Sequence, residues 1–283
     1  SRLTRERVAV ALSGDGGDEL FAGYLRLYWG ARAEGIPRWL VGLARRAVGV
    51  VGDPSHHRDI RSRASRFLRA ADLPLEERML NWIGFFPGSA LSMVRSHVAG
   101  EVSDDDLLHS FRLPLARAAG GSDLDRVLQL NFDTYLVDDL LTKVDRCSMA
   151  HGLEVRSPFL DTALMSFAAR IPDRYRAPGG RLKWALRRAF KDLLPDPILK
   201  RGKMGFGVPL GQWFRGHWRP VLESTFLGAD TPLWDWLEPD PVRDLTNDHL
   251  SGRSDHGHRL WALLTLDRWM RQSTATERME LHV

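Results

Sequence analysis

The sequence predicts an α/β fold of the nucleotide-binding type in which helices greatly outnumber strands. Arg7–Leu12 is a short apolar and β-branched run, typical of a strand buried on both faces. A turn rich in glycine and carboxylates follows at residues 13–19, and Leu20–Tyr28 has the pattern of a helix. A strand, a glycine turn and a helix in this order bind nucleotides at the carboxyl end of the strand.

The rest of the chain has helical spacing or capping and few strand signals. The predicted helices are Pro37–Val51, Ile60–Ala71, Leu75–Phe86, Asp104–Ala119, Asp123–Met149, Leu160–Ile171, Gly180–Leu194 and Arg259–Met270. The long stretch Asp123–Met149 is expected to break once near residues 137–139. A buried parallel strand needs neighbours on both sides, and the chain offers little that could pair with Arg7–Leu12. We therefore expect the other strands of the sheet to lie upstream and the chain to be the C-terminal piece of a larger protein.

Composition restricts the class of protein. The 283 residues are 43% apolar and 27% charged, an ordinary globular composition. No apolar run approaches the roughly 18 residues that span a bilayer, and the first residues have no signal-peptide core. Cys147 is the only cysteine, which favours the cytoplasm. A net charge of +4 is a weak signal for nucleic-acid binding, so no such partner is predicted.

The turn Ser13–Glu19 carries three carboxylates, those of Asp15, Asp18 and Glu19. They would repel one another unless a cation or a positive substrate group lay between them. The alternative is an acidic cap on a surface turn, because Asp and Glu favour the first turn of a helix. The turn is neither a Walker A loop nor a dinucleotide fingerprint, since no Gly-Lys-Ser/Thr follows and Glu19 stands where a third glycine would be needed.

Two later segments also carry dense charge. In Tyr135–Asp161, the i, i+4 pairs Asp138–Thr142 and Asp139–Lys143 would form a charge ladder on one helix face, or that face is simply solvated. The glycine-rich loop Lys200–Pro209 contains two lysines and one arginine, which suits gripping a phosphate, although a plain basic surface loop is the alternative. Only five residues of the chain are lysine, and four of them lie between positions 183 and 203.

Single cysteine and histidine residues carry less weight. Cys147 lies in a helical segment without a neighbouring base, so it is expected to be a small buried side chain rather than a nucleophile. The histidines lack the companion cysteines or the HExxH spacing of a metal site, so no histidine metal site is predicted.

Taken together, the segments Leu12–Tyr24, Asp138–Asp161 and Lys200–Trp213 resemble the asparagine synthetase family, specifically the C-terminal ATP-pyrophosphatase half of the glutamine-hydrolysing enzymes. The resemblance implies an adenine-nucleotide α-hydrolase-like fold, with the whole chain forming the C-terminal portion of one domain. Residues 1–36 would end the nucleotide-binding sheet, residues 37–126 would be a helical insert, and residues 127–283 would be the helical remainder.

The resemblance implies that ATP activates a carboxylate as an acyl-adenylate with release of pyrophosphate, and that ammonia then forms the amide. It makes the chain a carbon–nitrogen ligase of asparagine biosynthesis that uses ATP and Mg²⁺. The implied roles are nucleotide contact for Ser13, Gly14 and Gly16, a position near the acyl-adenylate for Asp15, the Mg²⁺ ligand for Asp18, a second acidic partner for Asp139 or Asp138 with Asp139 preferred, and stabilisation of phosphate charge for Lys203. Asp15 replaces the glutamate usual in the family and is one methylene shorter, which puts its reach in question.

Two parts of the family pattern are not found in this sequence. The Ser-Gly-Gly-x-Asp-Ser pyrophosphate loop and the glutaminase domain would both lie upstream. The predicted partners are therefore a missing sheet segment, a glutaminase domain that supplies ammonia, and aspartate or another carboxylate as substrate; a homodimer is compatible with this prediction. The 283 residues alone are expected to have no ATP turnover.

Three alternatives stay open at the level of sequence. Relatives of this fold build β-lactams, close lasso peptides or amidate surface sugars, although the acid at position 15 favours asparagine synthesis over β-lactam synthesis. A different class is a non-catalytic, arginine-rich helical module for nucleic acid or an acidic partner, whose binding would weaken steeply with salt. The third is a degenerate, scaffold-like homologue, which the retention of Asp15, Asp18 and Lys203 disfavours.

Overall fold

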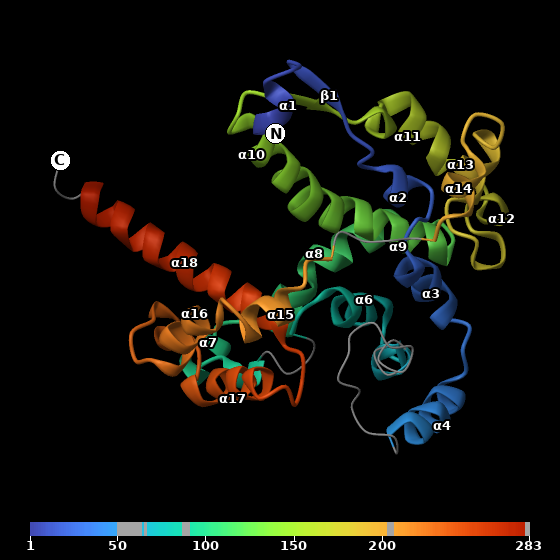
Figure 1. Cartoon of the computed structure of the whole chain (residues 1–283). Coiled ribbons are helices and arrows are strands. Elements are labelled where there is room, and N and C mark those ends of the chain that lie inside the picture. Colours follow the sequence, from blue (N-terminus) through green and yellow to red (C-terminus); the bar gives the residue numbers. More distant parts are fainter. Residues whose placement is uncertain (50–63, 65–66, 87–90, 203–206, 281–283) are drawn as a thin grey trace. The chain divides into compact units, whose positions relative to one another are not determined.

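The segments of the chain form two units, each with its own interior. The computed structural model describes residues 1–283 except 50–63, 65–66, 87–90, 203–206 and 281–283 (Figure 1). Unit 1 comprises Ser1–Ile36, Pro74–Glu76 and Leu108–Gly205, and unit 2 comprises Pro37–Leu73, Glu77–Leu107 and Phe206–Val283. The division of the chain at residues 36/37 and 126/127 stays a prediction.

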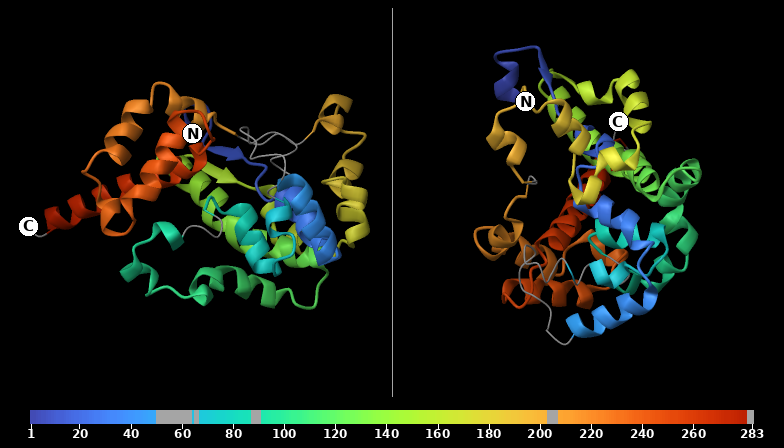
Figure 2. Two further views of the ribbon diagram at one scale, coloured as in Figure 1. Left: turned by 90° about the horizontal axis from the view of Figure 1, so that it is seen from below. Right: turned by 90° about the vertical axis from the view of Figure 1, so that its right-hand side faces the viewer.

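The sheet of unit 1 consists of two short parallel strands, β1 (Val10–Leu12) and β2 (Glu154–Arg156), which lie side by side (Figure 2). Val10 pairs with Glu154 and Leu12 with Arg156, and the Ser13 N–H extends the ladder with a hydrogen bond of 2.8 Å to the Arg156 carbonyl. The chain was expected to offer little that could pair with the opening strand, and β2 is a partner that this expectation missed. β2 escaped prediction because two of its three residues, Glu154 and Arg156, are charged and it contains no apolar run.

Helices form the rest of unit 1. They are α1 (Arg2–Arg5), α2 (Gly17–Leu20), α3 (Leu25–Ala33), α9 (Asp123–Asn131), η2 (Phe132–Leu141), α10 (Thr142–Met149), η3 (Pro158–Leu160), α11 (Thr162–Ala169), α12 (Asp173–Arg176), η4 (Pro178–Gly180), α13 (Trp184–Ala189) and α14 (Asp196–Lys200). α3 packs on α9, and α2 contacts both α9 and η2 (Figure 1). Helix α8 (Asp104–Arg117) has residues in both units.

The predicted helix Asp123–Met149 is continuous but changes type. A capping box between Ser122 and Asp125 starts α9, and its apolar residues Val127 and Leu130 are fully buried. At the expected break the chain forms a π-helix, η2, and then returns to α-helix in α10. A π-helix has i→i+5 hydrogen bonds, so each turn contains about one more residue than in an α-helix. The side chains of this segment therefore shift to other faces although the helix does not end.

The predicted helix Leu20–Tyr28 is interrupted, which is a correction to the sequence analysis. α2 ends at Leu20 and α3 begins at Leu25. Between them Ala22 has a positive φ of 51°, which a helix cannot accommodate. Alanine favours helices, so its residue type predicts the opposite conformation.

Unit 2 is helical throughout its named elements. They are α4 (Arg38–Gly49), most of α6 (Leu75–Ile83), η1 (Leu91–Met93), α7 (Ser96–Ala99), α15 (Leu210–Arg215), α16 (Arg219–Leu222), η5 (Glu223–Leu227), η6 (Pro232–Asp235), α17 (Pro239–Leu250) and α18 (Gly257–Glu280). Its core contains Phe214, Leu222, Phe226, Leu233, Val242 and Leu260, all fully buried. The predicted helix Ile60–Ala71 falls partly outside the described residues.

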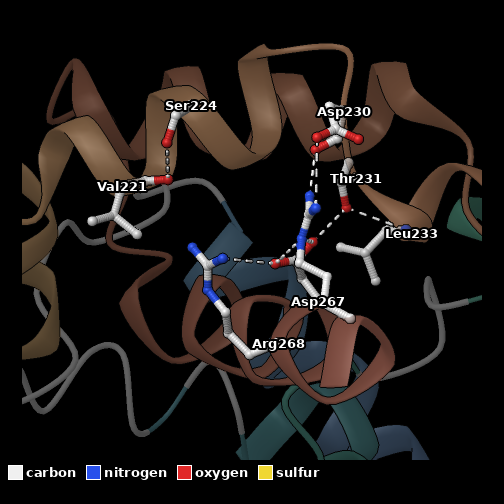
Figure 3. Close-up of polar contacts among 8 residues, drawn as sticks. Val221, Ser224, Asp230, Thr231, Leu233, Asp267 and Arg268 are labelled. Atoms are coloured by element: carbon white, nitrogen blue, oxygen red, sulfur yellow. Dashed lines mark hydrogen bonds and ion pairs between the residues drawn. The ribbon is translucent and has the colours of Figure 1, made fainter. Parts of the chain in front are cut away.

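A buried carboxylate links α18 to the segment before η6 (Figure 3). Asp267 is 0% exposed and accepts a hydrogen bond of 2.8 Å from the Thr231 hydroxyl. Its two oxygens also accept bonds of 3.1 and 3.2 Å from Nε of Arg271. Thr231 in turn caps η6 by accepting from the Leu233 N–H at 3.2 Å. The charge of Asp267 is therefore compensated inside the unit.

Two other sequence expectations concern exposure. Cys147 was expected to be buried but is exposed on α10, because the helix turns this side chain away from the interior of unit 1. Among the helices that the structure describes, none combines the length and the apolar character needed to cross a membrane.

Candidate active site

The turn after β1 holds Ser13, Gly14, Asp15 and Gly16, all predicted site residues, at the carboxyl end of the strand. The Ser13 hydroxyl donates a short hydrogen bond to Oδ2 of Asp15 and accepts the Asp15 N–H at 3.3 Å. These two bonds fix Asp15 within its own turn. Gly16 has φ 87° at the N-cap of α2, and a β-carbon there would overlap Leu160, so only glycine fits.

Asp18 forms an ion pair with a lysine that the sequence analysis did not select. Nζ of Lys183 lies 2.9 Å from Oδ1 of Asp18, and both side chains are mostly buried, at 27% and 19% exposure. Gly23 passes so close that a β-carbon would overlap the Asp18 carboxylate and lie 2.6 Å from Cε of Lys183. The interruption between α2 and α3 therefore makes room for this ion pair.

Backbone strain is concentrated at the same place. Within the described residues, Ala22 (φ 51°) and Lys183 (φ 54°) are the two non-glycine residues with positive φ. The Lys183 N–H donates to the Phe21 carbonyl at 3.1 Å, which ties the start of α13 to the interruption between α2 and α3. Such strain costs about 1–3 kcal/mol per residue and clusters at functional sites. The strained backbone holds the ammonium of Lys183 against Asp18.

The third carboxylate of the turn, Glu19, points into the interior and is 2% exposed. It accepts a hydrogen bond of 2.7 Å from the Tyr24 hydroxyl. Burial raises the pKa of Tyr24 above its ordinary value, and the charges of Glu19 and Asp18 raise it further. Asp15, Asp18 and Glu19 thus have three different partners: the Ser13 hydroxyl, the Lys183 ammonium and the Tyr24 hydroxyl.

Asp138 and Asp139 lie exposed on η2, which packs against α2. Neither has a hydrogen bond or ion pair to the acidic turn among the described residues. Of the two interpretations of this segment, the solvated helix face agrees with the exposure of Asp139 and Lys143; the wider π-helical turn takes i and i+4 residues out of register, and these two side chains form no ion pair with each other. The charge of Asp139 still acts within the unit, since it adds to the burial that raises the pKa of Tyr135.

Lys203, predicted to act on the phosphates, lies outside the described residues. Lys183 is the functional candidate that the sequence analysis missed. The available signal was the scarcity of lysine, because four of the five lysines fall between positions 183 and 203. What the sequence did not show was that the chain folds back to bring position 183 to the acidic turn.

An apolar cavity of about 510 Å³ lies beside this site in unit 1. Its lining includes Phe21, Phe159, Phe167 and Leu186, with Arg170 as the charged member. Phosphates and the carboxylates of a small amino acid need hydrogen-bond donors, which this lining hardly provides. The turn and Lys183 therefore offer charged groups that the cavity lining, apart from Arg170, lacks.

The donor set at the turn suits Mg²⁺ only together with a ligand. Mg²⁺ is commonly held by one or two carboxylates plus substrate phosphates and water. Asp18 offers a carboxylate at the turn, and the described residues contain no group of three or more His, Cys, Asp or Glu that could hold a metal by themselves. Asp18 fits a metal ion that arrives with phosphate.

The fold and the site together show a strand, a glycine turn and a helix that place the carboxylate of Asp18 beside the ammonium of Lys183. The chain belongs to the asparagine synthase family, whose model matches residues 1–271. It is 27% identical over 273 residues to asparagine synthetase (glutamine-hydrolysing) 1 of Bacillus subtilis, covering 95% of this chain and 41% of that protein.

A further relative is a Mycobacterium tuberculosis protein provisionally named as a glutamine-hydrolysing asparagine synthetase. It is 32% identical over 270 residues, covering 95% of this chain and 40% of that protein. The enzyme of the same name from Gallus gallus is 38% identical over 95 residues, covering 32% of this chain and 16% of that protein. The chain thus spans about 40% of the length of the two bacterial relatives.

Proposed function

We propose that the chain is the synthetase part of an AMP-forming ligase that converts aspartate to asparagine with ATP and ammonia. The single observation that carries the proposal is the Asp18–Lys183 ion pair, held by strained backbone at the carboxyl end of β1 in a member of the asparagine synthase family. A carboxylate next to an ammonium suits a site where phosphate charge is bound and redistributed.

In the first step, a carboxylate oxygen of aspartate attacks the α-phosphorus of ATP. The bond from that phosphorus to the oxygen bridging to the β-phosphate breaks, and pyrophosphate leaves with the electron pair. Negative charge grows on the leaving group, so a fixed ammonium lowers the barrier. We assign this role to Lys183, which lies beside Asp18, and to Lys203.

The other residues of the turn position the reactants. Ser13, Gly14 and Gly16 contact the nucleotide, and Asp15 lies near the acyl-adenylate. Asp18 would hold Mg²⁺, which when bound neutralises phosphate oxygens. Asp139 serves as the second acidic group. In the second step, ammonia attacks the acyl carbon and AMP leaves, giving the amide.

Two partners lie outside this chain in our proposal. A glutaminase domain supplies ammonia, and further parallel strands with a pyrophosphate loop complete the sheet. The exposed positions Val10 (39%) and Leu12 (75%) on β1 support the second partner, since apolar strand residues are normally covered. The 283 residues alone are expected to form no AMP from ATP; measurable turnover by them would contradict this.

The test is ATP–pyrophosphate exchange by the complete protein with a panel of carboxylic acids. We expect exchange with aspartate, and formation of AMP and asparagine once glutamine is added. Exchange only with other acids would assign the chain to a natural-product or sugar amidotransferase instead. Absence of exchange together with salt-sensitive binding of nucleic acid would support the non-catalytic module.

A further inference from the structure

Arg26, in the first turn of α3, contacts residues from three separate elements of unit 1. Its guanidinium carbon lies 4.6 Å from the ring centroid of Tyr24 and 4.6 Å from that of Tyr135. The two rings meet edge to face, with centroids 6.0 Å apart. Nη2 of Arg26 donates to Oδ1 of Asn131, the fully buried last residue of α9, at 3.3 Å. One cation therefore joins the N-cap of α3, the π-helix η2 and the end of α9.

These contacts lead directly to the acidic turn on one side. Tyr24 donates its hydroxyl to Glu19, which follows Asp18 in α2 and is almost fully buried. A buried carboxylate with a neutral donor is stabilised by a nearby positive charge. The guanidinium of Arg26 lies over the ring of the same Tyr24. Through Tyr24 and Glu19, Arg26 is connected to α2, the helix that carries Asp18.

On the other side the contacts lead to Asp139. Tyr135 and Asp139 share the π-helix η2, and Tyr135 is the residue of η2 that meets Arg26. π-Helical turns are rare and occur frequently at functional sites, where they set the direction of particular side chains. If η2 rotated or returned to α-helix, Asp139 would point elsewhere. The contact between Arg26 and Tyr135 opposes that rotation.

We propose that Arg26 is a positioning residue that fixes the acidic turn carrying Asp15 and Asp18 relative to the π-helix carrying Asp139. The inference rests on the proposed function, in which these carboxylates serve one reaction. Arg26 is not a catalytic residue, because it acts through Tyr24 and Tyr135. Lysine could not replace it fully, since a lysine lacks the planar guanidinium that packs on two rings and reaches Asn131.

The test compares Arg26→Met, Arg26→Lys and a matched control in the complete protein. The control is Arg32→Met, which removes a second arginine of α3 that lies over a tyrosine ring, at 5.6 Å from the centroid of Tyr28. Aspartate-dependent ATP–pyrophosphate exchange is measured over ATP and Mg²⁺ concentration. We expect Arg26→Met to lower kcat by about 10- to 100-fold with little change in KM, because misplaced groups mainly raise the barrier.

Arg26→Lys should fall between Arg26→Met and the wild type, and Arg32→Met should match the wild type. A purely structural role would lower the amount of folded protein, not kcat per folded molecule. Hydrogen exchange adds a readout without activity: the amides of η2 should exchange faster in Arg26→Met but not in Arg32→Met. If Arg26→Met does not fold, Tyr135→Leu and Tyr135→Phe replace it, with loss of kcat expected for leucine and retention for phenylalanine.

Wild-type kcat and unchanged η2 exchange in a folded Arg26→Met or Tyr135→Leu protein would overturn the inference. This outcome is distinct from failure of the proposed function. In that case the wild type would show no exchange with any carboxylic acid, while hydrogen exchange of η2 would still report whether Arg26 holds the helix.

Discussion

Asp18 in unit 1 and Asp267 in unit 2 are both carboxylates that bind basic side chains, yet their surroundings differ. Asp267 is fully buried and compensated by Thr231, Arg271 and, at 3.7 Å, Arg268 (Figure 3). Asp18 keeps part of its surface and has Lys183 as its ion-pair partner, presented by a backbone with positive φ.

In our proposal, the difference separates a carboxylate that stabilises a fold, Asp267, from one that serves a bound ligand, Asp18. Asp267 is fully buried, and the described residues next to it in the chain have no positive φ. Its hydrogen bonds therefore form without backbone strain of this kind. The Asp18 site is built with strain at Ala22 and Lys183, and folding alone gains little from that arrangement. A substitution of Asp18 should therefore mainly lower activity, and a substitution of Asp267 should mainly lower stability.

The largest expected effect is on activity, from Asp18→Asn. Replacing the carboxylate by an amide removes the charge that would hold Mg²⁺ and orient Lys183, so ATP–pyrophosphate exchange should fall by about 100-fold or more. The free energy of unfolding should change less than in Asp267→Asn, because the Asp18 side chain keeps 19% of its surface exposed whereas Asp267 is fully buried. Exchange assays and urea unfolding of the complete protein measure both effects. A loss of stability without loss of exchange would show that Asp18 serves the fold and not the reaction.

Asp267→Asn should show the opposite behaviour. Removing one partner of a buried, hydrogen-bonded charge network costs about 3 kcal/mol of stability, because Arg271 loses its buried counter-ion and keeps the exposed carboxylate of Asp230, 3.6 Å away. Exchange per folded molecule should remain at the wild-type level. Thermal or urea unfolding checks the first statement, and exchange normalised to folded protein checks the second.

Gly23→Ala should affect both properties at once, by smaller amounts. The added methyl group overlaps the Asp18 carboxylate and approaches Cε of Lys183, so the ion pair must move or the backbone must yield. Overpacking of this kind costs about 1–3 kcal/mol. The free energy of unfolding and the rate of exchange should both decrease. If neither changes, the turn can adjust to the added methyl group in solution. Gly42→Ala is a suitable control, since nothing lies within 4 Å of its β-carbon position.

The smallest expected effect is a pH dependence of stability from His249, which is fully buried in unit 2. Its Nδ1 accepts the His256 N–H at 3.0 Å, so protonation would break this bond. Burial lowers the pKa of His249, the positive charge of Arg215 lowers it further, and Asp255 opposes the shift. Below the ordinary histidine pKa of about 6.5, the unfolded chain binds a proton that the folded chain does not. The free energy of unfolding therefore decreases as the pH is lowered below this value.

Urea unfolding at pH 7.5 and pH 5.5 tests this sign. His249→Asn keeps an acceptor for the His256 N–H but does not titrate, so its stability should decline less between the two pH values. Equal pH slopes for the variant and the wild type would assign the acid sensitivity to other groups.

The sequence was informative where local chemistry decides the structure. The apolar run before a glycine turn predicted β1 and the turn of Ser13–Gly16, and helical spacing predicted α8 and α18. The interruption at Ala22 could not be predicted, because it depends on tertiary packing of Asp18 and Lys183 against Gly23. The conformation of alanine there is imposed by contacts that no short pattern records.

β2 and the position of Lys183 are two further features that the sequence could not predict. Glu154–Arg156 is a strand only because β1 pairs with it, and nothing in three residues with two charges indicates a sheet. Lys183 lies in an amphipathic segment that reads as an ordinary helix start. Its position beside Asp18, 165 residues earlier in the chain, is set by the fold of the whole unit.

The central claim is that the Asp18–Lys183 pair belongs to the reaction and not merely to the fold. Its most direct test is ATP–pyrophosphate exchange by Lys183→Met in the complete protein, beside Lys191→Met, whose side chain is exposed and pairs with its neighbour Asp192. We expect Lys183→Met to lose about 10-fold or more of the exchange rate while remaining folded, and Lys191→Met to keep it. Wild-type exchange in a folded Lys183→Met protein would contradict the account.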